Sequence, residues 1–433
     1  MTNCLMKCFM IIMIIIERIK KERQINMEVV AGGVCAAKGF YAAGAEAGIK
    51  YQNRKDMALV YSEMPCICAG TFTSNVVKAA PVLWDKNIVE NSPYAQAVIV
   101  NSGIANACTG REGMECCERT AAAAGRALNI PADSVLIGST GVIGMQIPVE
   151  RIEAGIEKLA AGKAHSKEAA QLAAEAIMTT DTVDKQVAVQ FEIGGKTVTM
   201  GGMSKGSGMI HPNMCTMLAF VTCDIAISKQ LLQKAVSESI IDSFNMISVD
   251  GDTSTNDTFL FLANGQAGNP ELTEENADYE TFKEALNYIN TTLAKKMAGD
   301  GEGATALFET KVIGARNKNE ARILSKSVIC SSLTKAAIFG HDANFGRILC
   351  ALGYSGVDFD PDHVDLYFQG KNDRIHIYGD GVACDYSEEE ATKILSEPEV
   401  TVLVDMHQGD GEATAWGCDL SYEYVKINAD YRS

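Results

Sequence analysis

The sequence predicts an α/β fold, and three observations lead to that prediction. Short apolar runs that end in a turn, such as 97–100 before Asn101-Ser-Gly103, are typical of buried strands. Alanine-rich and amphipathic stretches of helical spacing alternate with these runs. Hydrophobic residues make up 47% of the 433 residues, which allows a large core. A chain of this length forms two domains or one large α/β body.

The individual elements follow from periodicity and from start and stop signals. In order, we expect a strand at 97–100, helices at 112–128, 149–161 and 166–178, a hairpin of 187–193 with 197–200 across Gly194-Gly195, a strand at 217–225, a helix at 228–244 capped by Ser228, a strand at 258–262, a helix at 274–297 with an apolar stripe, and a strand at 400–404. The glycine-rich segment 201–208 is the strongest internal boundary.

The most informative segment runs from Lys205 to Thr216 and enters the apolar run at Met217. A flexible glycine-rich approach and a polar turn place one hydroxyl at the mouth of a buried strand. A threonine hydroxyl needs an adjacent base to become a nucleophile. If the chain were cut between Cys215 and Thr216, the new α-amine, with a pKa of roughly 7.7–8.0, would be that base. The alternatives are a plain turn that leads into a core strand, or Cys215 as the nucleophile.

This segment resembles the self-cleaving segment of the ornithine acetyltransferase (ArgJ) family. The family usually has alanine at the position of Cys215. Other blocks match the family in the same order, so that the resemblance extends over about 27–433: Asn101-Ser-Gly-Ile-Ala-Asn-Ala-Cys-Thr-Gly110, Gly138-Ser-Thr-Gly-Val-Ile-Gly144, Met178-Thr-Thr-Asp-Thr182, Asp342-Ala-Asn-Phe-Gly-Arg347 and Lys426-Ile-Asn-Ala-Asp-Tyr-Arg-Ser433.

The resemblance implies a layered α/β sandwich of the N-terminal-nucleophile type, cleaved into an α chain, 27–215, and a β chain, 216–433. Thr216 would take the acetyl group of N-acetylornithine and pass it to glutamate in a ping-pong reaction. No metal or bound organic cofactor is implied, although acetyl-CoA is a possible second donor substrate. The two chains would assemble as α₂β₂.

The resemblance also assigns the residues that stabilise charge during the reaction. Thr140 and Gly141 are implied as the oxyanion-hole pair, because a tetrahedral intermediate needs donors aimed at its oxyanion. By spacing alone they form an ordinary turn at a strand end. Thr179 is implied as a substrate contact, with its neighbour Thr180 as the alternative assignment. By spacing alone these threonines close a helix.

The remaining implied substrate contacts come from three separate segments. Lys205 would pair with a substrate carboxylate, although most lysines are simply solvated. Glu302, between two glycines, would bind the ammonium of ornithine, and the similar Asp410-Gly-Glu412 is a competing candidate. Asn428 and Ser433 match substrate contacts at the family terminus, where chain ends are commonly frayed.

Composition limits the partners. A net charge of −17 argues against nucleic-acid binding. The acidic field would repel glutamate-like substrates, so a local Lys or Arg must offset it. The scattered cysteines match no zinc pattern and indicate reduced core residues of a cytoplasmic protein.

The first 26 residues form a separate unit. We interpret 1–26 as a non-native extension upstream of a true start at Met27. The apolar run 9–16 is too short to span a bilayer, which takes about 20 residues. The alternative is a weak amphipathic membrane contact.

Two other classes of function remain open. One is a self-processing aminopeptidase or amidase of the N-terminal-nucleophile type, in which water accepts the acyl group. The other is a non-catalytic binding protein built on the same core.

Overall fold

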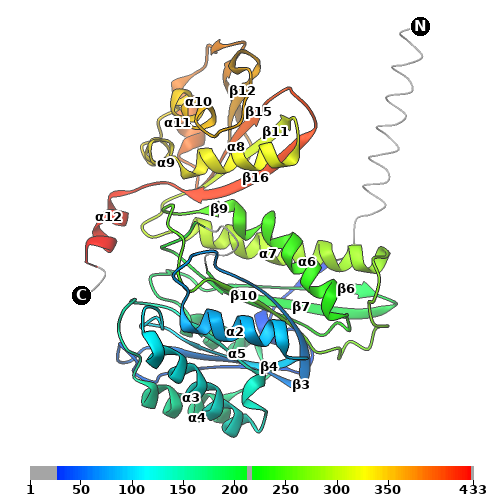
Figure 1. Cartoon of the computed structure of the whole chain (residues 1–433). Helices are drawn as coiled ribbons and strands as arrows, with labels where there is room; N and C mark the ends of the chain where they lie inside the picture. The colour runs from blue at the N-terminus through cyan, green and yellow to red at the C-terminus, as the bar shows by residue number, and fades with distance from the viewer. Residues whose placement is uncertain (1–26, 212–216, 431–433) are drawn as a thin grey trace.

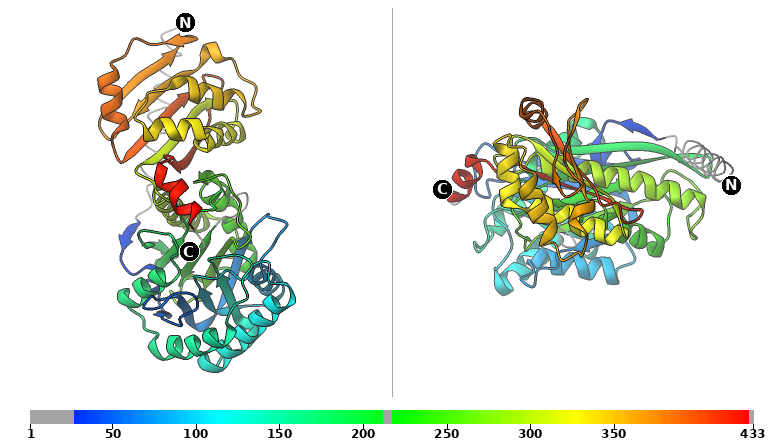
Figure 2. Two further views of the ribbon diagram at one scale, coloured as in Figure 1. Left: turned by 90° about the vertical axis from the view of Figure 1, so that its left-hand side faces the viewer. Right: turned by 90° about the horizontal axis from the view of Figure 1, so that it is seen from above.

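The computed structural model describes residues 27–211 and 217–430. Predictions that concern residues 1–26, Cys215, Thr216 and Ser433 therefore lie outside the described residues. The described chain forms two bodies, one around a large sheet and one around a smaller sheet (Figure 1). Figure 2 shows the C-terminal helix α12, Tyr422–Ala429, lying at the junction of the two bodies.

The large sheet has the strand order β1-β6-β7-β8-β10-β3-β4-β5, with β2 paired to β3. Its strands are β1 Glu28–Val30, β2 Phe40–Ala45, β3 Met57–Phe72, β4 Ala95–Asn101, β5 Val135–Ser139, β6 Lys185–Ile193, β7 Lys196–Lys205, β8 Leu218–Cys223 and β10 Thr258–Ala263. Strand β7 pairs antiparallel with both β6 and β8. The pairs β8 with β10 and β4 with β5 are parallel.

Strand β3 joins two halves of this sheet that face each other. Its residues 67–72 pair with β10, and its residues 57–61 pair with β2 and β4. Because side chains alternate along a strand, each half buries two faces. Phe220 and Leu260 from one half share a core with Val98 from the other. The two halves therefore form the inner layers of a sandwich.

Helices cover the outer faces of the sandwich (Figure 1). They are α2 Ala80–Asn91, α3 Gly110–Leu128, α4 Val149–Gly162, α5 Lys167–Ala176, α6 Lys229–Ile241 and α7 Ala277–Gly299. Helices α6 and α7 pack on β6, β7, β8 and β10, while α3 and α4 pack on β3, β4 and β5. Helix α5 lies against β2 and β3 beside the inner core. This arrangement confirms the predicted layered α/β fold.

The second body contains a seven-stranded sheet of order β14-β13-β12-β15-β11-β16-β9. Its strands are β9 Ile247–Ser248, β11 Leu307–Ala315, β12 Asp365–Gln369, β13 Arg374–Gly379, β14 Val382–Ala383, β15 Glu399–Asp405 and β16 Gly411–Cys418, and its helices are α8 Lys318–Cys330, α9 Ser332–Phe339, α10 Phe345–Gly353 and α11 Glu388–Leu395. One hydrophobic core runs without a break from α7 into β11 and β15, so the two bodies are packed together.

Most predicted elements are present, within a few residues of their expected ends. The hairpin is β6 and β7, and the stripe of the 274–297 helix, Phe282, Leu286, Ile289 and Leu293, is fully buried in α7. Two details were wrong. Helix α7 begins only after Asn276, whose side chain caps it by accepting from the N–H of Tyr279. Ser228 stands at the start of α6, but its side chain makes no capping hydrogen bond.

The first half of the glycine-rich segment 201–208 is part of a strand. It is therefore neither a flexible lead into the cleavage segment nor a boundary between domains. Residues up to Lys205 belong to β7, and Lys205 pairs with Leu218 of β8. Gly201 is needed for close packing, because a Cβ there would lie 1.8 Å from the carbonyl oxygen of Gly33. The glycines therefore let a neighbouring segment approach the strand, and Lys205 stands on a rigid support.

Candidate active site

A cavity of about 290 Å³ opens where several strands of the large sheet begin or end. Strands β5 and β7 end at it, and β8 and β10 begin at it. The loop after α7 and the helix α12 complete its wall. Its lining is Thr140, Gly141, Val142, Ile143, Thr179, Thr180, Lys205, Gly206, Gly208, Met209, Ile210, Met217, Leu218, Ser254, Asn256, Asp257, Glu302 and Asn428.

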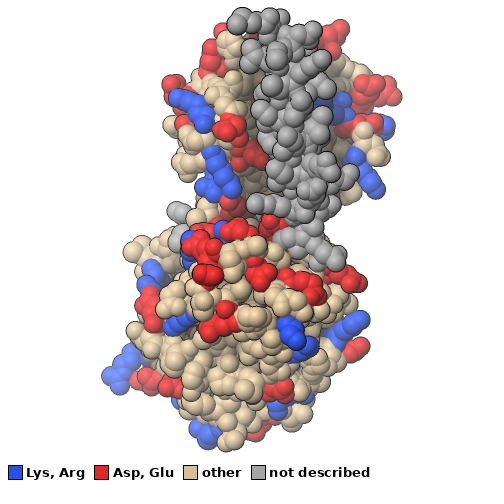
Figure 3. Space-filling view, turned by 90° about the vertical axis from the view of Figure 1, so that its right-hand side faces the viewer, with Lys and Arg blue, Asp and Glu red and all other residues tan. Residues whose placement is uncertain are grey.

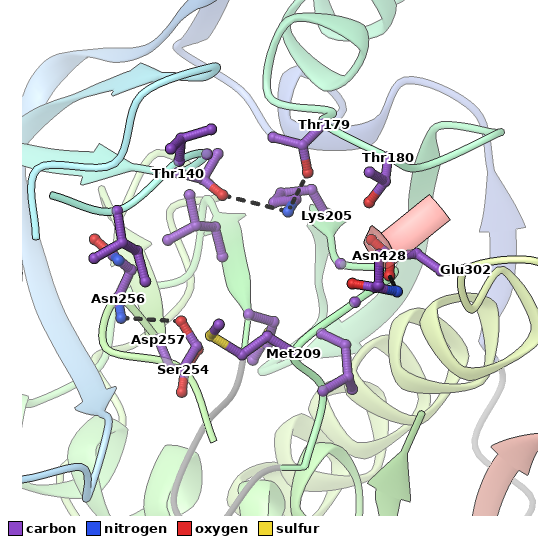
Figure 4. Close-up of a pocket in the computed structure, with 18 residues that line it drawn as sticks. Thr140, Thr179, Thr180, Lys205, Met209, Ser254, Asn256, Asp257, Glu302 and Asn428 are labelled. Atoms are coloured by element: carbon purple, nitrogen blue, oxygen red, sulfur yellow. Dashed lines mark hydrogen bonds between the residues drawn. The ribbon is translucent and has the colours of Figure 1, made fainter. Parts of the chain in front are cut away.

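The cavity brings together every described residue that the sequence predicted for the site. These six residues come from five separate parts of the chain and are Thr140, Gly141, Thr179, Lys205, Glu302 and Asn428. Figure 4 shows Thr140 and Thr179 directed towards Lys205, with Glu302 and Asn428 on a neighbouring wall. Thr180, the alternative to Thr179, also lines the cavity, but only Thr179 bonds the lysine.

The Lys205 ammonium joins the two predicted threonines. Its Nζ donates to Thr179 Oγ1 at 2.8 Å and to Thr140 Oγ1 at 3.3 Å. Each hydroxyl accepts from the ammonium, so each keeps its own proton available for an acceptor in the cavity. Burial lowers the pKa of Lys205, and the nearby carboxylate of Asp181 opposes that shift. The cavity thus presents a cation and two hydroxyl donors within one small region.

The carboxylate of Asp181 forms an ion pair with this lysine. That carboxylate lies 3.9 Å from Lys205 Nζ, and its Oδ1 accepts from Lys185 Nζ at 2.7 Å and from the N–H of Gly206 at 2.8 Å. Lys185 also pairs with Asp300 at 2.5 Å. Burial alone would raise the pKa of Asp181, but the two ammonium groups hold it well below its usual range. A buried carboxylate with this many partners stays ionised.

Gly141 offers a backbone donor. Its φ of +127° is unfavourable for residues with a side chain, and a Cβ would lie 2.3 Å from the carbonyl carbon of Gly103. On either side, the N–H of Thr140 bonds Asn101 and the N–H of Val142 bonds Gly103. Among the described residues, no acceptor pairs with the N–H of Gly141. A backbone N–H beside a hydroxyl is the donor set that an oxyanion requires.

Glu302 supplies negative charge on another wall. It is only 6% exposed, its backbone N–H donates to the carbonyl oxygen of Ser207, and its Oε2 accepts from Asn428 Nδ2 at 2.7 Å. The competing candidate Glu412 lies on β16 beside a different cavity, with Asp410 and Lys311. The fold therefore favours Glu302 over Glu412 as the carboxylate of the candidate active site.

Asp257 was not predicted from the sequence, yet it is 1% exposed and lines the cavity with Ser254 and Asn256 (Figure 4). Burial raises the pKa of its carboxyl well above the usual range, although hydrogen bonds from Ser254, Thr73 and the backbone of Met217 oppose the shift. Its Oδ2 has no hydrogen-bond partner among the described residues. A signal existed in the polar run 253–257, which directly precedes a buried strand.

Three further polar residues, His211, His341 and Asn344, do not line the cavity. The ring of His211 contacts Ser248 Oγ at 3.1 Å and Cys330 Sγ at 3.5 Å, and burial lowers its pKa to about 4. Asn344 caps α10 in the second body, where His341 is exposed. Within 27–211 and 217–430, no group of three or more His, Cys, Asp or Glu side chains could hold a metal ion. In the same ranges no helix is long and apolar enough to cross a membrane.

Comparison with known proteins identifies the family. The family model described as the ArgJ family matches residues 41–433. The chain belongs to the ArgJ family. ArgJ membership confirms the resemblance read from the sequence motifs, and it confirms that the chain is an enzyme rather than a non-catalytic binding protein.

Individual relatives agree. The arginine biosynthesis bifunctional protein ArgJ 1 of Clostridium acetobutylicum is 51% identical over 394 residues, which cover 91% of this chain and 96% of that protein. An ArgJ crystal structure from Bacillus halodurans shares 45% identity over 48% of this chain and 97% of that chain, with a TM-score of 0.47. An ornithine acetyltransferase of Mycobacterium tuberculosis, solved in complex with ornithine, shares 40% identity over 43% of this chain and 99% of that chain, with a TM-score of 0.40.

The buried carboxyl of Asp257 predicts a pH-dependent stability difference. An acid with a raised folded pKa stabilises the fold fully below its unfolded pKa, about 3.9, and loses that contribution as pH rises through the folded pKa. Asp257→Asn removes this titration. The thermal midpoint of Asp257→Asn, relative to the unchanged protein, should therefore rise between about pH 5 and pH 8, by about 2 °C or more.

Calorimetry of both proteins across that range makes the measurement, after a denaturing gel has shown that both have the same chain composition. Asp133→Asn, which removes an exposed carboxyl, is the matched control. A constant difference for Asp257→Asn would show that Asp257 is ionised in the fold.

Proposed function

We propose that this enzyme transfers the acetyl group of N-acetylornithine to glutamate, as a member of the arginine biosynthesis pathway. The observation that carries the proposal is the convergence in one cavity of a buried cation, two hydroxyls, a buried carboxylate and a backbone N–H that has no acceptor among the described residues. That cavity lies at the start of β8, and its lining residue Met217 directly follows Thr216 in the sequence. Curated relatives are named bifunctional ArgJ proteins of arginine biosynthesis.

The proposed nucleophile is Thr216, freed by self-cleavage between Cys215 and Thr216 into chains 27–215 and 216–433. An N→O acyl shift moves the carbonyl of Cys215 from nitrogen to the threonine oxygen, and water then releases the first chain. The new α-amine takes the hydroxyl proton when Thr216 attacks the acetyl carbonyl. Met217, the next residue, lines the cavity, which supports an attack into that space.

The oxyanion of each tetrahedral intermediate would be held by the Thr140 hydroxyl and the Gly141 N–H. The ammonium of Lys205 polarises the Thr140 hydroxyl and strengthens it as a donor. Collapse of the first intermediate expels the α-amine of ornithine, which takes up the proton. The neutral amine of glutamate then attacks the acetyl-enzyme and loses a proton to the α-amine of Thr216. That proton passes to the departing Thr216 oxygen, so that Thr216 is regenerated and N-acetylglutamate is released.

Substrate binding would use the charges on the cavity walls. Lys205 and Thr179 would hold the α-carboxylate that both amino acids carry, because a buried cation beside a hydroxyl suits a carboxylate. Glu302, oriented by Asn428, would receive the ornithine ammonium. Ser433, outside the described residues, remains a proposed contact on the grounds of the family resemblance.

Three further features are proposed from the family resemblance. Acetyl-CoA would serve as a second acetyl donor, and the chains would assemble as α₂β₂. A cytoplasmic location is consistent with the described cysteines, all of which are free thiols.

The cleavage proposal predicts the behaviour of Thr216→Ala. This variant should run as one uncut chain on a denaturing gel and should show no transferase activity. The unchanged protein should give two fragments. Edman sequencing of the C-terminal fragment should give threonine, Thr216, in the first cycle. A first residue of Cys215 would assign the nucleophile to that thiol instead.

A matched pair of threonine variants separates binding from chemistry. Thr140 and Thr179 both accept from Lys205, and replacement by valine exchanges the hydroxyl for a methyl group of similar size. Thr140→Val should lower kcat by about 10²–10³ because it removes an oxyanion donor. Thr179→Val should act mainly on KM, because its hydroxyl contacts the ground state and the transition state alike.

Single-turnover acetylation of cleaved protein, followed by intact mass, measures the Thr140 effect directly. A Thr140→Val enzyme that is cleaved and still acetylated at the full rate would refute the oxyanion assignment.

The donor is tested by supplying acetyl-CoA and glutamate to purified enzyme. Formation of N-acetylglutamate is expected. Its absence, while N-acetylornithine supports turnover, would make the enzyme monofunctional. Release of acetate in preference to acetylated glutamate would favour the aminopeptidase or amidase alternative.

A further inference from the structure

A second cavity of about 200 Å³ adjoins the candidate active site. The two cavities share a wall made of Gly141, Val142, Thr179 and Thr180. We call the second one the side cavity, and its remaining lining is Tyr51, Arg54, Gly103, Met178 and Ile427. Because Thr179 bonds Lys205, the side cavity begins just beyond the place proposed for the substrate α-carboxylate.

A buried cation, Lys50, lies behind the wall of this side cavity, next to two of its lining residues. Lys50 Nζ is out of contact with solvent and has no hydrogen-bond partner among the described residues. Its stem packs at Gly103, where a Cβ would lie 3.2 Å from the Lys50 Cβ, and its Nζ stands 4.8 Å from the centre of the Tyr51 ring. Gly103 and Tyr51 both line the side cavity.

An unpaired buried ammonium is costly, and one aromatic ring offsets only part of that cost. The neighbouring Arg54 also lines the side cavity, and its Nη2 donates to the carbonyl oxygens of Met178 at 2.7 Å and Thr179 at 3.0 Å. Arg54 therefore holds the shared wall in place, whereas the ammonium of Lys50 is left free to bind an anion.

The proposed acceptor needs such a cation. Ornithine and glutamate share an α-carboxylate, but the side chain of glutamate ends in a second carboxylate and that of ornithine ends in an ammonium. In the main cavity Glu302 suits the ammonium and would repel a second carboxylate. A chain with a net charge of −17 must supply a local cation for that group.

We propose that the side cavity binds the side-chain carboxylate of the acceptor, with the Lys50 ammonium as its charge partner, an inference that rests on the proposed transfer to glutamate. The long, flexible lysine stem allows the ammonium to meet a carboxylate that enters past Thr179. The two substrates would then share the α-carboxylate site and direct their oppositely charged side chains to different cavities.

Lys50→Met tests the proposal, with Lys55→Met as the matched control. Lys55 belongs to the same loop but forms a surface ion pair with Glu175 at 3.3 Å, whereas Lys50 Nζ has no hydrogen-bond partner among the described residues. Lys50→Met should lower kcat/KM for glutamate by about 10- to 100-fold, through KM, and should reduce the preference for glutamate over glutamine as acceptor. Lys50→Arg should restore much of that preference.

The first half-reaction separates this inference from the proposed function. Acetylation of the enzyme by N-acetylornithine, followed by intact mass, should be the same in Lys50→Met, Lys55→Met and the unchanged enzyme. Failure of the unchanged enzyme to acetylate glutamate would refute the proposed function. An unchanged glutamate-to-glutamine ratio in Lys50→Met would refute the role of Lys50.

Calorimetric titration with glutamate gives a readout that does not depend on turnover. Weaker binding to Lys50→Met than to Lys55→Met supports the side cavity, and equal binding overturns it. Equal losses in both half-reactions of Lys50→Met would show a structural defect and would also overturn the specific role in acceptor binding.

Discussion

The buried ion network of Lys185 with Asp181 and Asp300 is the interaction on which the site depends. It ties the start of β6 to the end of α7 and to the turn after α5, and through Gly206 it also fixes the end of β7. Removing one member of such a network leaves an uncompensated buried charge, which typically costs about 3–5 kcal/mol. Asp181 also faces Lys205, so the network that joins the elements also sets the charge of the cavity.

This network would reconcile an acidic protein with the anionic substrates that we propose. Acidic side chains gather near the junction of the two bodies on the face shown in Figure 3, and the net charge of the chain is −17. Long-range attraction of a carboxylate is therefore unfavourable, and binding must come from short contacts. A buried cation in a low dielectric interacts more strongly at close range than one in water. Lys205, and by our proposal Lys50, provide that cation at two separate points.

Sequence patterns predicted more of the first body than of the second. The 187–200 hairpin and the stripe of α7 follow from period and turn chemistry, which are local properties. The second body pairs β11 with β15 and β16, nearly a hundred residues apart in the chain, and such pairing leaves no local signal. For the site, motifs in the sequence indicated Thr140 and Lys205 through the resemblance. Asp257 was missed because its importance comes from burial at the cavity, which only the fold determines.

The shared lysine also links binding to chemistry. Lys205 donates to Thr179, which would meet the substrate carboxylate, and to Thr140, which would meet the oxyanion. When a carboxylate binds, part of the positive charge of Lys205 is neutralised, and its polarisation of Thr140 weakens. In this arrangement, tighter binding of the α-carboxylate by Lys205 would make the Thr140 hydroxyl a weaker hydrogen-bond donor to the oxyanion. The N–H of Gly141, which has no acceptor among the described residues and does not contact Lys205, would keep one proposed donor unaffected by substrate charge. A site with one coupled and one independent donor can bind two different amino acids and retain the same chemistry for both.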